Sequence, residues 1–275
     1  MEQNLSKKTR TESDLIGSRE VPESALYGVQ TLRGIENFRI SKFHLNEYPL
    51  FIQALAITKM GAAVANRELD LLTEEQTDAI LKACKEILEG KHHDQFPVDM
   101  IQGGAGTTTN MNANEVIANR ALELMGHARG EYQYCSPNDH VNRSQSTNDA
   151  YPTAIHIGLY YTHLKLVKHF ATLIEAFRKK GAEFAHIIKM GRTQLEDAVP
   201  MTLGQTFNGF ASILSHEVKN LDFAAQDFLA VNMGATAIGT GDSICRTSNK
   251  AQPPKMVMKI AHKKPIIPSN TAKII

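Results

Sequence analysis

Metal and disulfide signals are nearly absent from this sequence. Its 275 residues include no tryptophan and only three cysteines, Cys84, Cys135 and Cys245. An odd number of widely spaced cysteines predicts neither a disulfide framework nor a zinc site. The eleven histidines form no His-x-x-x-His pair. The sequence therefore predicts a protein of a reducing compartment, with no metal and no cofactor.

Long apolar runs are also missing. No stretch approaches the roughly 18 uncharged apolar residues that span a bilayer. The first residues, Met1–Leu5, lack the apolar core of a signal peptide. These absences argue against a membrane protein and predict a cytoplasmic location. Apolar residues still make up 42% of the chain and charged residues 21%, which is ordinary for a globular protein.

The chain as a whole has no large excess of positive or negative charge, since the formal net charge is +1. The balance is uneven along the chain, because residues 242–275 hold seven basic residues against one acidic residue, with four of the ten prolines. A basic tail can bind nucleic acid, but this one has no aromatic residue on which a base could stack. We expect no nucleic-acid partner and a disordered tail.

Helical patterns dominate what the sequence does contain. Residues 1–48 carry glycine and polar breaks and predict extended arms and loops. A helix is expected from Pro49, because proline suits the first helical turn. Thr73 and Gln76 have the spacing of a capping box at the start of a second helix. A third helix is predicted over about residues 112–125.

Two much longer helices are predicted from large apolar residues at heptad spacing. The first covers about residues 152–189 and carries Leu159, Leu166 and Leu173 with Phe170, Phe177 and Phe184. The second runs from Leu203 to Phe228, after a loop expected at residues 190–200, and the length of each should be near or above thirty residues. Such a pair would leave apolar surface exposed, so it needs partners from other chains or from further sequence. We predict an all-α fold, with an N-terminal helical domain and part of a long-helix bundle.

Three polar segments stand where these helices begin or break. Residues 103–110, Gly-Gly-Ala-Gly-Thr-Thr-Thr-Asn, offer close backbone approach and free N–H groups at a helix start, although they also fit a simple turn. Residues 144–149, Ser-Gln-Ser-Thr-Asn-Asp, exceed what N-capping requires and suit a carboxylate at a positive helix end. Residues 191–200 fit either a site segment or an interhelical loop.

Taken in order, these segments resemble the aspartase/fumarase superfamily. The matching strings lie at Gly104–Glu115, Pro137–Asp149, Gly191–Gln205 and Asn232–Gly241, and the resemblance covers residues 10–241. It implies an N-terminal helical domain, a central domain of long helices that four subunits share in a homotetramer, and a small C-terminal domain. It also implies reversible elimination of ammonia or water from a dicarboxylate, giving fumarate.

The same resemblance implies the residues of the substrate site. Thr107, Ser146, Thr147 and Asn148 are expected around the dicarboxylate and its amino group, and Thr193 and Gln194 are expected from a neighbouring subunit. No catalytic residue is assigned. In the family, a serine on a loop of the form Gly-Ser-Ser-x-Met-Pro-x-Lys-x-Asn removes the proton, and this string does not occur in the sequence.

Three positions favour the ammonia-eliminating branch, whose substrate is L-aspartate, over the fumarases. Fumarases of this class typically have His where Gln194 stands, Ser where Thr147 stands and Thr where Val199 stands. Some fumarases use His-Pro-Asn-Asp at a second dicarboxylate site, where residues 136–139 here read Ser-Pro-Asn-Asp. A class II fumarase is the alternative enzyme.

The resemblance stops after Gly241. We therefore expect domains at residues 1–145 and 146–241, followed by the basic tail at 242–275, in a chain truncated after the first part of the central helical domain. Such a chain should carry part of the substrate site and show little or no turnover. An alternative of a different class is a non-catalytic helical remnant, or oligomerisation module, that binds other chains.

Overall fold

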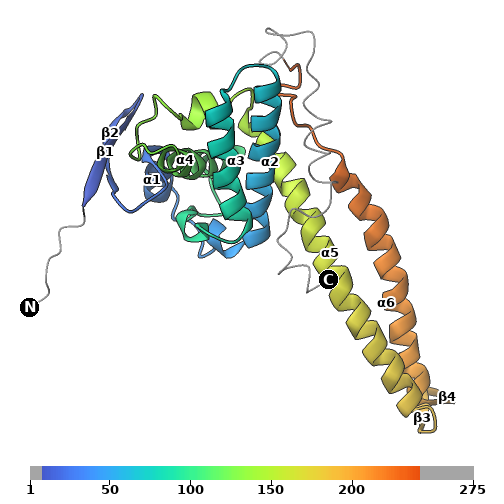
Figure 1. The fold of residues 1–275 in the computed structure, drawn as a ribbon. Helices are drawn as coiled ribbons and strands as arrows, with labels where there is room; N and C mark the ends of the chain where they lie inside the picture. The colour runs from blue at the N-terminus through green and yellow to red at the C-terminus, as the bar shows by residue number, and fades with distance from the viewer. Residues whose placement is uncertain (1–7, 242–275) are drawn as a thin grey trace, which may run out of the picture. The chain divides into compact units, whose positions relative to one another are not determined.

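The computed structural model describes residues 8–241, which fall into two compact units. Residues 8–158 and 231–241 form the first unit, and residues 159–230 form the second. The predominantly helical fold predicted from the sequence is confirmed, with two short β-hairpins in addition (Figure 1). The domain boundary at residue 145 stays a prediction. The predicted disordered tail, residues 242–275, lies outside the described residues.

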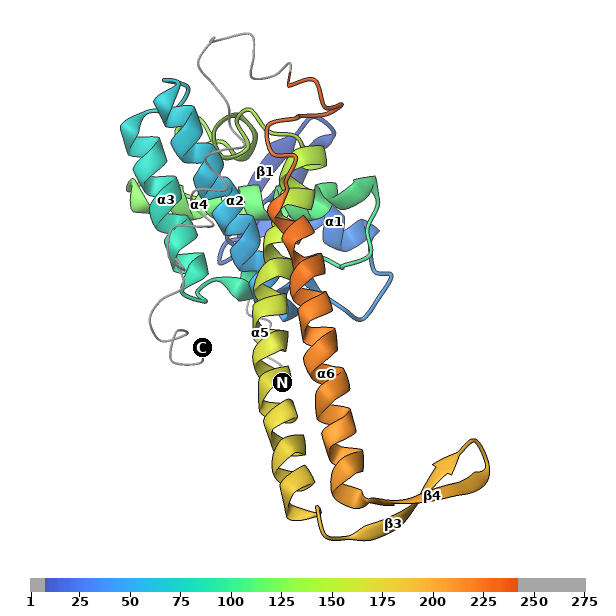
Figure 2. The ribbon, with the colours of Figure 1, turned by 90° about the vertical axis from the view of Figure 1, so that its right-hand side faces the viewer.

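Three helices make the body of the first unit (Figures 1 and 2). They are α2 (Pro49–Glu68), α3 (Glu74–Leu88) and α4 (Thr107–Leu124). The predicted starts of the first two are confirmed: Pro49 opens α2, and Thr73 and Gln76 exchange capping-box hydrogen bonds of 3.2 Å each. The third begins five residues before the prediction. Their core is made of fully buried side chains such as Ile52, Leu55, Ile80, Ile87, Ile117 and Leu122.

A short helix that the sequence did not predict, α1 (Val29–Asn37), is capped by distant carboxylates. Glu115, on α4, accepts hydrogen bonds from the backbone N–H groups of Gly28, Gln30 and Thr31 at 2.8, 2.9 and 3.0 Å. Glu12 accepts one from Val29 at 3.0 Å. These bonds satisfy the N–H groups that every helix start leaves without intrahelical partners, so the start of α1 depends on tertiary contacts.

The N-terminal segment is a hairpin rather than the expected extended arm. Strand β1 (Thr9–Asp14) pairs antiparallel with β2 (Gly17–Pro22) across a two-residue turn. Arg10 holds the hairpin to the chain that follows it, because its guanidinium donates to the carbonyl oxygens of Pro22, Ala25 and Tyr27 at 2.8–3.0 Å. Single-turn helices complete the chain: η1 (Leu45–Glu47), η2 (His93–Gln95), η3 (Gly104–Gly106), η4 (Pro137–Val141) and η5 (Gln226–Leu229).

Two long helices and a second hairpin account for the second unit. Helix α5 (Thr147–Glu183) starts in the first unit and continues into the second, where it lies beside α6 (Leu203–Ala225) (Figure 2). The 37 residues of α5 agree with the expected length near or above thirty, whereas α6, with 23 residues, is shorter than expected. The loop predicted at residues 190–200 is instead a hairpin of β3 (Ile188–Thr193) and β4 (Glu196–Thr202).

Aromatic side chains hold α5 against α6 within the second unit. Phe177 lies 6.0 Å from Phe207 and 5.6 Å from Phe210, measured between ring centroids, and Phe184 lies 5.6 Å from Phe207. The predicted leucine series stays outside this contact, since Leu159, Leu166 and Leu173 are each at least 43% exposed. The pair therefore has an uncovered apolar face, as the sequence led us to expect.

We predict that the chain self-associates through this face. Exposed residues such as Leu166, Phe210 and Phe223 leave apolar area in water, and each large side chain gains roughly 1.5–3 kcal/mol on burial. Sedimentation velocity at micromolar concentration should find assemblies larger than one chain. Replacing Leu166 and Leu173 by glutamine should shift the distribution toward monomer. A compact monomer before any substitution would contradict the prediction.

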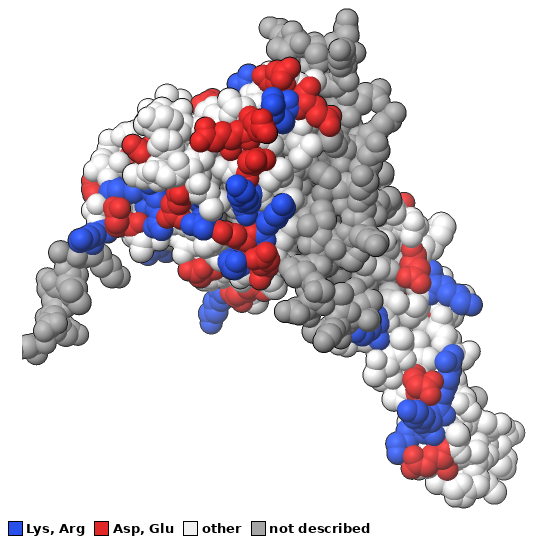
Figure 3. All heavy atoms as spheres, viewed as in Figure 1, with Lys and Arg blue, Asp and Glu red and all other residues white. Residues whose placement is uncertain are grey.

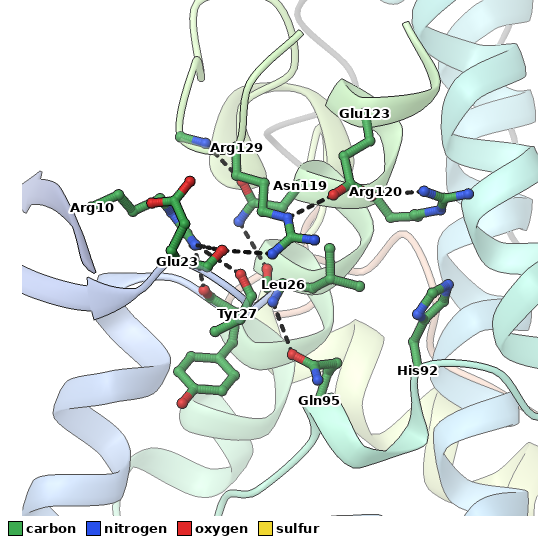
Figure 4. A network of polar contacts seen from close by, with 12 residues as sticks. Arg10, Glu23, Leu26, Tyr27, His92, Gln95, Asn119, Arg120, Glu123 and Arg129 are labelled. Carbon is green, nitrogen blue, oxygen red and sulfur yellow. Dashed lines mark hydrogen bonds and ion pairs between the residues drawn. The ribbon is translucent and has the colours of Figure 1, made fainter. Parts of the chain in front are cut away.

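A charged network crosses the surface of the first unit. Glu86 accepts two hydrogen bonds from Arg120, at 2.6 and 2.8 Å. Glu123 accepts from Arg120 and Arg129 at 2.7 and 2.6 Å (Figure 4). On the face drawn in Figure 3, acidic and basic side chains lie interspersed. The hydrogen bonds from Arg120, assisted by His92, lower the pKa of Glu86 to about 2.

We expect this network to weaken in acid. Because the pKa of Glu86 is below its ordinary value of 4.5, its stabilising contribution is present above about pH 4.5 and is lost as the pH falls toward 2. Glu86→Gln should remove about 1.5–3 kcal/mol at pH 7 and flatten the pH dependence of the unfolding free energy between pH 4.5 and 2. Glu75→Gln, at an exposed position on α3, serves as the control. If the unfolding free energies of both variants depend on pH in the same way, Glu86 does not make the proposed contribution to stability.

Candidate substrate site

The polar segment that precedes α5 is held by a buried aspartate. Asp149 is 0% exposed and accepts three backbone hydrogen bonds. The donors are the N–H groups of Ser146 at 2.9 Å and of Gly234 and Thr236 at 3.0 Å each. The first bond closes the start of the helix, and the other two attach residues 232–241, which return from the end of α6. One carboxylate therefore fixes two of the predicted family segments to each other.

Asn148, a predicted substrate residue, joins the same contact. Its side-chain amide donates to the carbonyl oxygen of Ala237 at 2.7 Å, while Asn232 donates to the carbonyl oxygen of Asn148 at 3.0 Å. The residue is nevertheless exposed. The returning segment therefore orients Asn148 without burying it.

The glycine-rich turn leads directly into α4. Gly106, immediately before the helix, has a left-handed φ of 95°, which favours glycine. A Cβ atom at this position would lie 2.5 Å from the ring of Tyr151. Thr107, the first residue of α4, is exposed and donates its hydroxyl hydrogen to the carbonyl oxygen of Gly104 at 2.7 Å. The glycine allows the turn to lie against the first turn of α5.

A recess of about 460 Å³ lies between these two helix starts within the first unit. It is lined by Met100, Gln102, Ala105, Gly106, Asn148, Tyr151 and Pro152. The structure thus brings the glycine turn and Asn148 to one recess. Ser146 and Thr147 are half-buried beside Asn148 in the chain. Asn110, on α4, donates to the Thr147 hydroxyl oxygen at 3.2 Å.

A lysine that the sequence did not single out lies beneath this region. Lys59, on α2, is 0% exposed, and its ammonium group donates to the side-chain oxygens of Asn110, Asn142 and Gln145 at 2.7, 2.9 and 2.9 Å. Burial lowers the pKa of Lys59 to about 7, while the charge of Asp149 acts in the opposite direction. The ammonium therefore links α2, α4 and the segment before α5.

The two remaining predicted site residues belong to the second unit. Thr193 ends β3, and Gln194 opens the two-residue turn of the hairpin with a φ of 49°. Both side chains are exposed, and the neighbouring Leu195 is 100% exposed. Arg192 and Asp197 form a cross-strand ion pair of 3.0 Å that stabilises this tip. The hairpin thus presents both residues to solvent.

Sequence reasoning missed Lys59 altogether, and it assigned no site role to Asn110, Asn142 or Asp149, although these three lie within the predicted polar segments or family strings. A weak signal for Lys59 was available, because it is the one charged residue between Pro49 and Asn66. Asp149 was read only as part of a polar cluster, since its partners lie 85 and 87 residues further along the chain.

The described residues also bear on metal ligands and membrane spans. Over residues 8–241, no group of three or more His, Cys, Asp or Glu side chains could hold a metal ion. In the same range, no helix combines the length and the apolar character needed to cross a membrane.

Comparison with known proteins supplies independent information. The family model described as lyase matches residues 17–261, so the match extends past the end of the sequence motifs at Gly241. Aspartate ammonia-lyase of Escherichia coli strain K12 is 56% identical over 238 residues, which cover 86% of this chain and 50% of that protein. Aspartate ammonia-lyase of Pseudomonas fluorescens is 58% identical over 233 residues, covering 84% of this chain and 49% of the relative. The chain spans about half the length of the curated relatives it matches.

Solved structures agree on the fold. A protein titled fumarate lyase:delta crystallin from Brucella melitensis, bound to cobalt, matches with a TM-score of 0.84 and 48% identity, covering 92% of this chain and 54% of that one. A recombinant class II fumarase from Schistosoma mansoni matches with a TM-score of 0.82 and 33% identity, covering 97% of this chain and 54% of that one.

Proposed function

The chain belongs to the lyase family whose model matches residues 17–261, and from that premise we propose that it carries part of the substrate site of an aspartate ammonia-lyase. The reaction of the complete site is the reversible elimination of ammonia from L-aspartate to give fumarate. Identities of 55–58% to curated aspartate ammonia-lyases support this choice. So does the lower identity, 33%, to the class II fumarase structure.

The observation that carries the proposal is the meeting of two helix N-termini. Helix α4 begins at Thr107 and α5 at Thr147, and the Asn110–Thr147 hydrogen bond of 3.2 Å joins their first turns. Each helix start bears partial positive charge from the helix dipole, which favours an anion. Two such ends beside one recess suit a small molecule with two carboxylates.

The proposed residues bind and orient the substrate. Thr107, Ser146 and Thr147 supply hydroxyl groups, and Asn148 supplies an amide, around the carboxylates and the amino group. When the proton next to one carboxylate leaves, negative charge grows on that carboxylate, and preorganised donors stabilise it. Within residues 8–241 we assign no base.

A complete site needs further copies of the chain. We propose that Thr193 and Gln194 of a neighbouring subunit enter it, in a homotetramer built on the uncovered face of α5 and α6. Their exposure on the tip of the β3–β4 hairpin supports this role. The free thiols of Cys84 and Cys135 support a cytoplasmic location.

Fumarate binding tests the proposal on the 275-residue chain. Calorimetric titration should detect fumarate, and Thr147→Val, which removes the hydroxyl at constant shape, should weaken binding about tenfold, corresponding to one hydrogen bond to a charged group. Thr172→Val, at an exposed position further along α5, is the matched control. A chain that self-associates but binds no fumarate would instead be the non-catalytic helical module.

Substrate choice gives a separate prediction. Gln194 offers an amide, which does not titrate near neutral pH, where fumarases offer an imidazole. We expect fumarate release from L-aspartate to stay near background with this chain alone. It should rise when the chain is assembled with the C-terminal half of the Escherichia coli aspartate ammonia-lyase. In that assembly L-aspartate should react faster than L-malate, and the reverse order would support the fumarase alternative.

A further inference from the structure

Lys59 occupies an unusual place for a lysine. It is one of the largest fully buried side chains among residues 8–241, and burial of an ammonium group is costly unless its hydrogen bonds are satisfied. Its three N–H groups meet three oxygens, those of Asn110, Asn142 and Gln145, at 2.7–2.9 Å. All three acceptors are neutral amides. The number of donors therefore equals the number of acceptors only while the lysine is protonated.

These bonds give the amide network a direction. Because the Asn110 side-chain oxygen accepts from Lys59, its amide nitrogen faces the other way and donates to Asn142 and Thr147, each at 3.2 Å. The Thr147 hydroxyl oxygen is thus an acceptor toward Asn110. Its hydrogen points away from Asn110 and can be donated to an anion.

We propose that Lys59 is a positioning residue of the dicarboxylate site, which fixes the hydrogen-bond direction Lys59→Asn110→Thr147 so that the Thr147 hydroxyl donates to a substrate carboxylate. This inference rests on the function proposed above. Without the ammonium, the Asn110 amide can turn over and present its oxygen to Thr147. The hydroxyl hydrogen would then be used inside the protein rather than on the substrate.

Protonation of Lys59 gives the network a pH dependence. The titratable groups whose charges act on Lys59 are Asp149, from α5, and Cys84, from α3. Burial raises the pKa of Cys84 to about 12, so this thiol stays neutral. Since the pKa of Lys59 is lowered to about 7, a rising pH converts it to an amine with two N–H groups for three acceptors. Fumarate affinity should therefore decrease as the pH rises through about 7.

Unfolding does not explain such a decrease. Between about pH 7 and the ordinary lysine value of 10.5, the unfolded chain binds more protons at this residue than the folded chain does. The contribution of Lys59 to stability therefore rises with pH over that range. Binding and stability should change in opposite directions.

A double-mutant cycle tests the route through Thr147. Lys59→Met retains the length of the side chain and removes all three donors. It should weaken fumarate binding about tenfold and abolish the pH dependence, whereas Lys82→Met, exposed on α3, should change neither. In a Thr147→Val background the effect of Lys59→Met should largely disappear. Additive losses would overturn the proposal.

A measurement on the unsubstituted chain covers the case in which Lys59→Met does not fold. In NMR spectra, the side-chain amide signals of Asn110 should titrate with the same midpoint as the Lys59 Cε signal. Different midpoints, or an Asn110 signal that does not move, would overturn the positioning role. This readout needs no ligand, so failure to bind fumarate would count against the proposed function alone.

Discussion

Replacing Asp149 by alanine should detach residues 232–241 from the start of α5 and lower the stability of the first unit strongly. Three backbone N–H groups lose their acceptor, those of Ser146, Gly234 and Thr236. Leaving a buried donor without a partner costs about 1–3 kcal/mol. Since part of the freed segment can reach water, we expect a loss of about 3–5 kcal/mol in total.

Calorimetry and proteolysis check this result together. A loss of this size corresponds to a fall of about 10 °C or more in the unfolding temperature of a unit of this length. New cleavage sites should appear in residues 232–241. Asp78→Ala, at an exposed position on α3, should leave both measurements unchanged. An Asp149→Ala protein that melts within a degree of the unsubstituted chain would show that the carboxylate does not hold the segment.

Gly106→Ala should damage both the fold and the site. The residue needs a left-handed φ of 95°, which costs an alanine about 1–2 kcal/mol. The new Cβ would also lie 2.5 Å from ring atoms of Tyr151, so the ring must shift, at a further cost of about 1–3 kcal/mol. Because Tyr151 lines the recess, we expect fumarate affinity to fall with stability.

A second glycine separates the two causes. Gly126, after α4, has a similar φ of 84°, but no atom lies within 4 Å of the position that a Cβ atom would take there. Gly126→Ala should therefore lose only the conformational part, about 1–2 kcal/mol, and should keep its fumarate affinity. If both variants lose the same stability and bind fumarate equally well, the contact with Tyr151 is not limiting.

Helix starts with local signals were predictable from the sequence. Pro49 opens α2 through its fixed φ, and Thr73 caps α3 through a partner three residues away. The same capping geometry, between Thr202 and Gln205, begins α6, and it is equally visible in the sequence. Such signals depend on residues within one helical turn, so they can be read without knowing the fold.

The second hairpin shows where local patterns failed. We expected an interhelical loop at residues 190–200. The structure pairs Ile188 with Thr202 and Thr193 with Glu196, and it bridges them through Gln194 in a left-handed conformation. A glutamine followed by a leucine has no strong preference for a tight turn, so the pairing of the two strands rather than the turn residues decides this structure.

By itself, the sequence determined the helical class, the starts of α2 and α3, and the kinds of polar side chain at the starts of α4 and α5. Only the tertiary structure decided that these last two helix starts share one recess. It also decided that Asp149 binds a segment 85 residues away and that Lys59 lies beneath Thr147. The physical reason is range: propensity and capping act over about one helical turn, whereas the partners of a buried charge come from whichever distant segments pack around it.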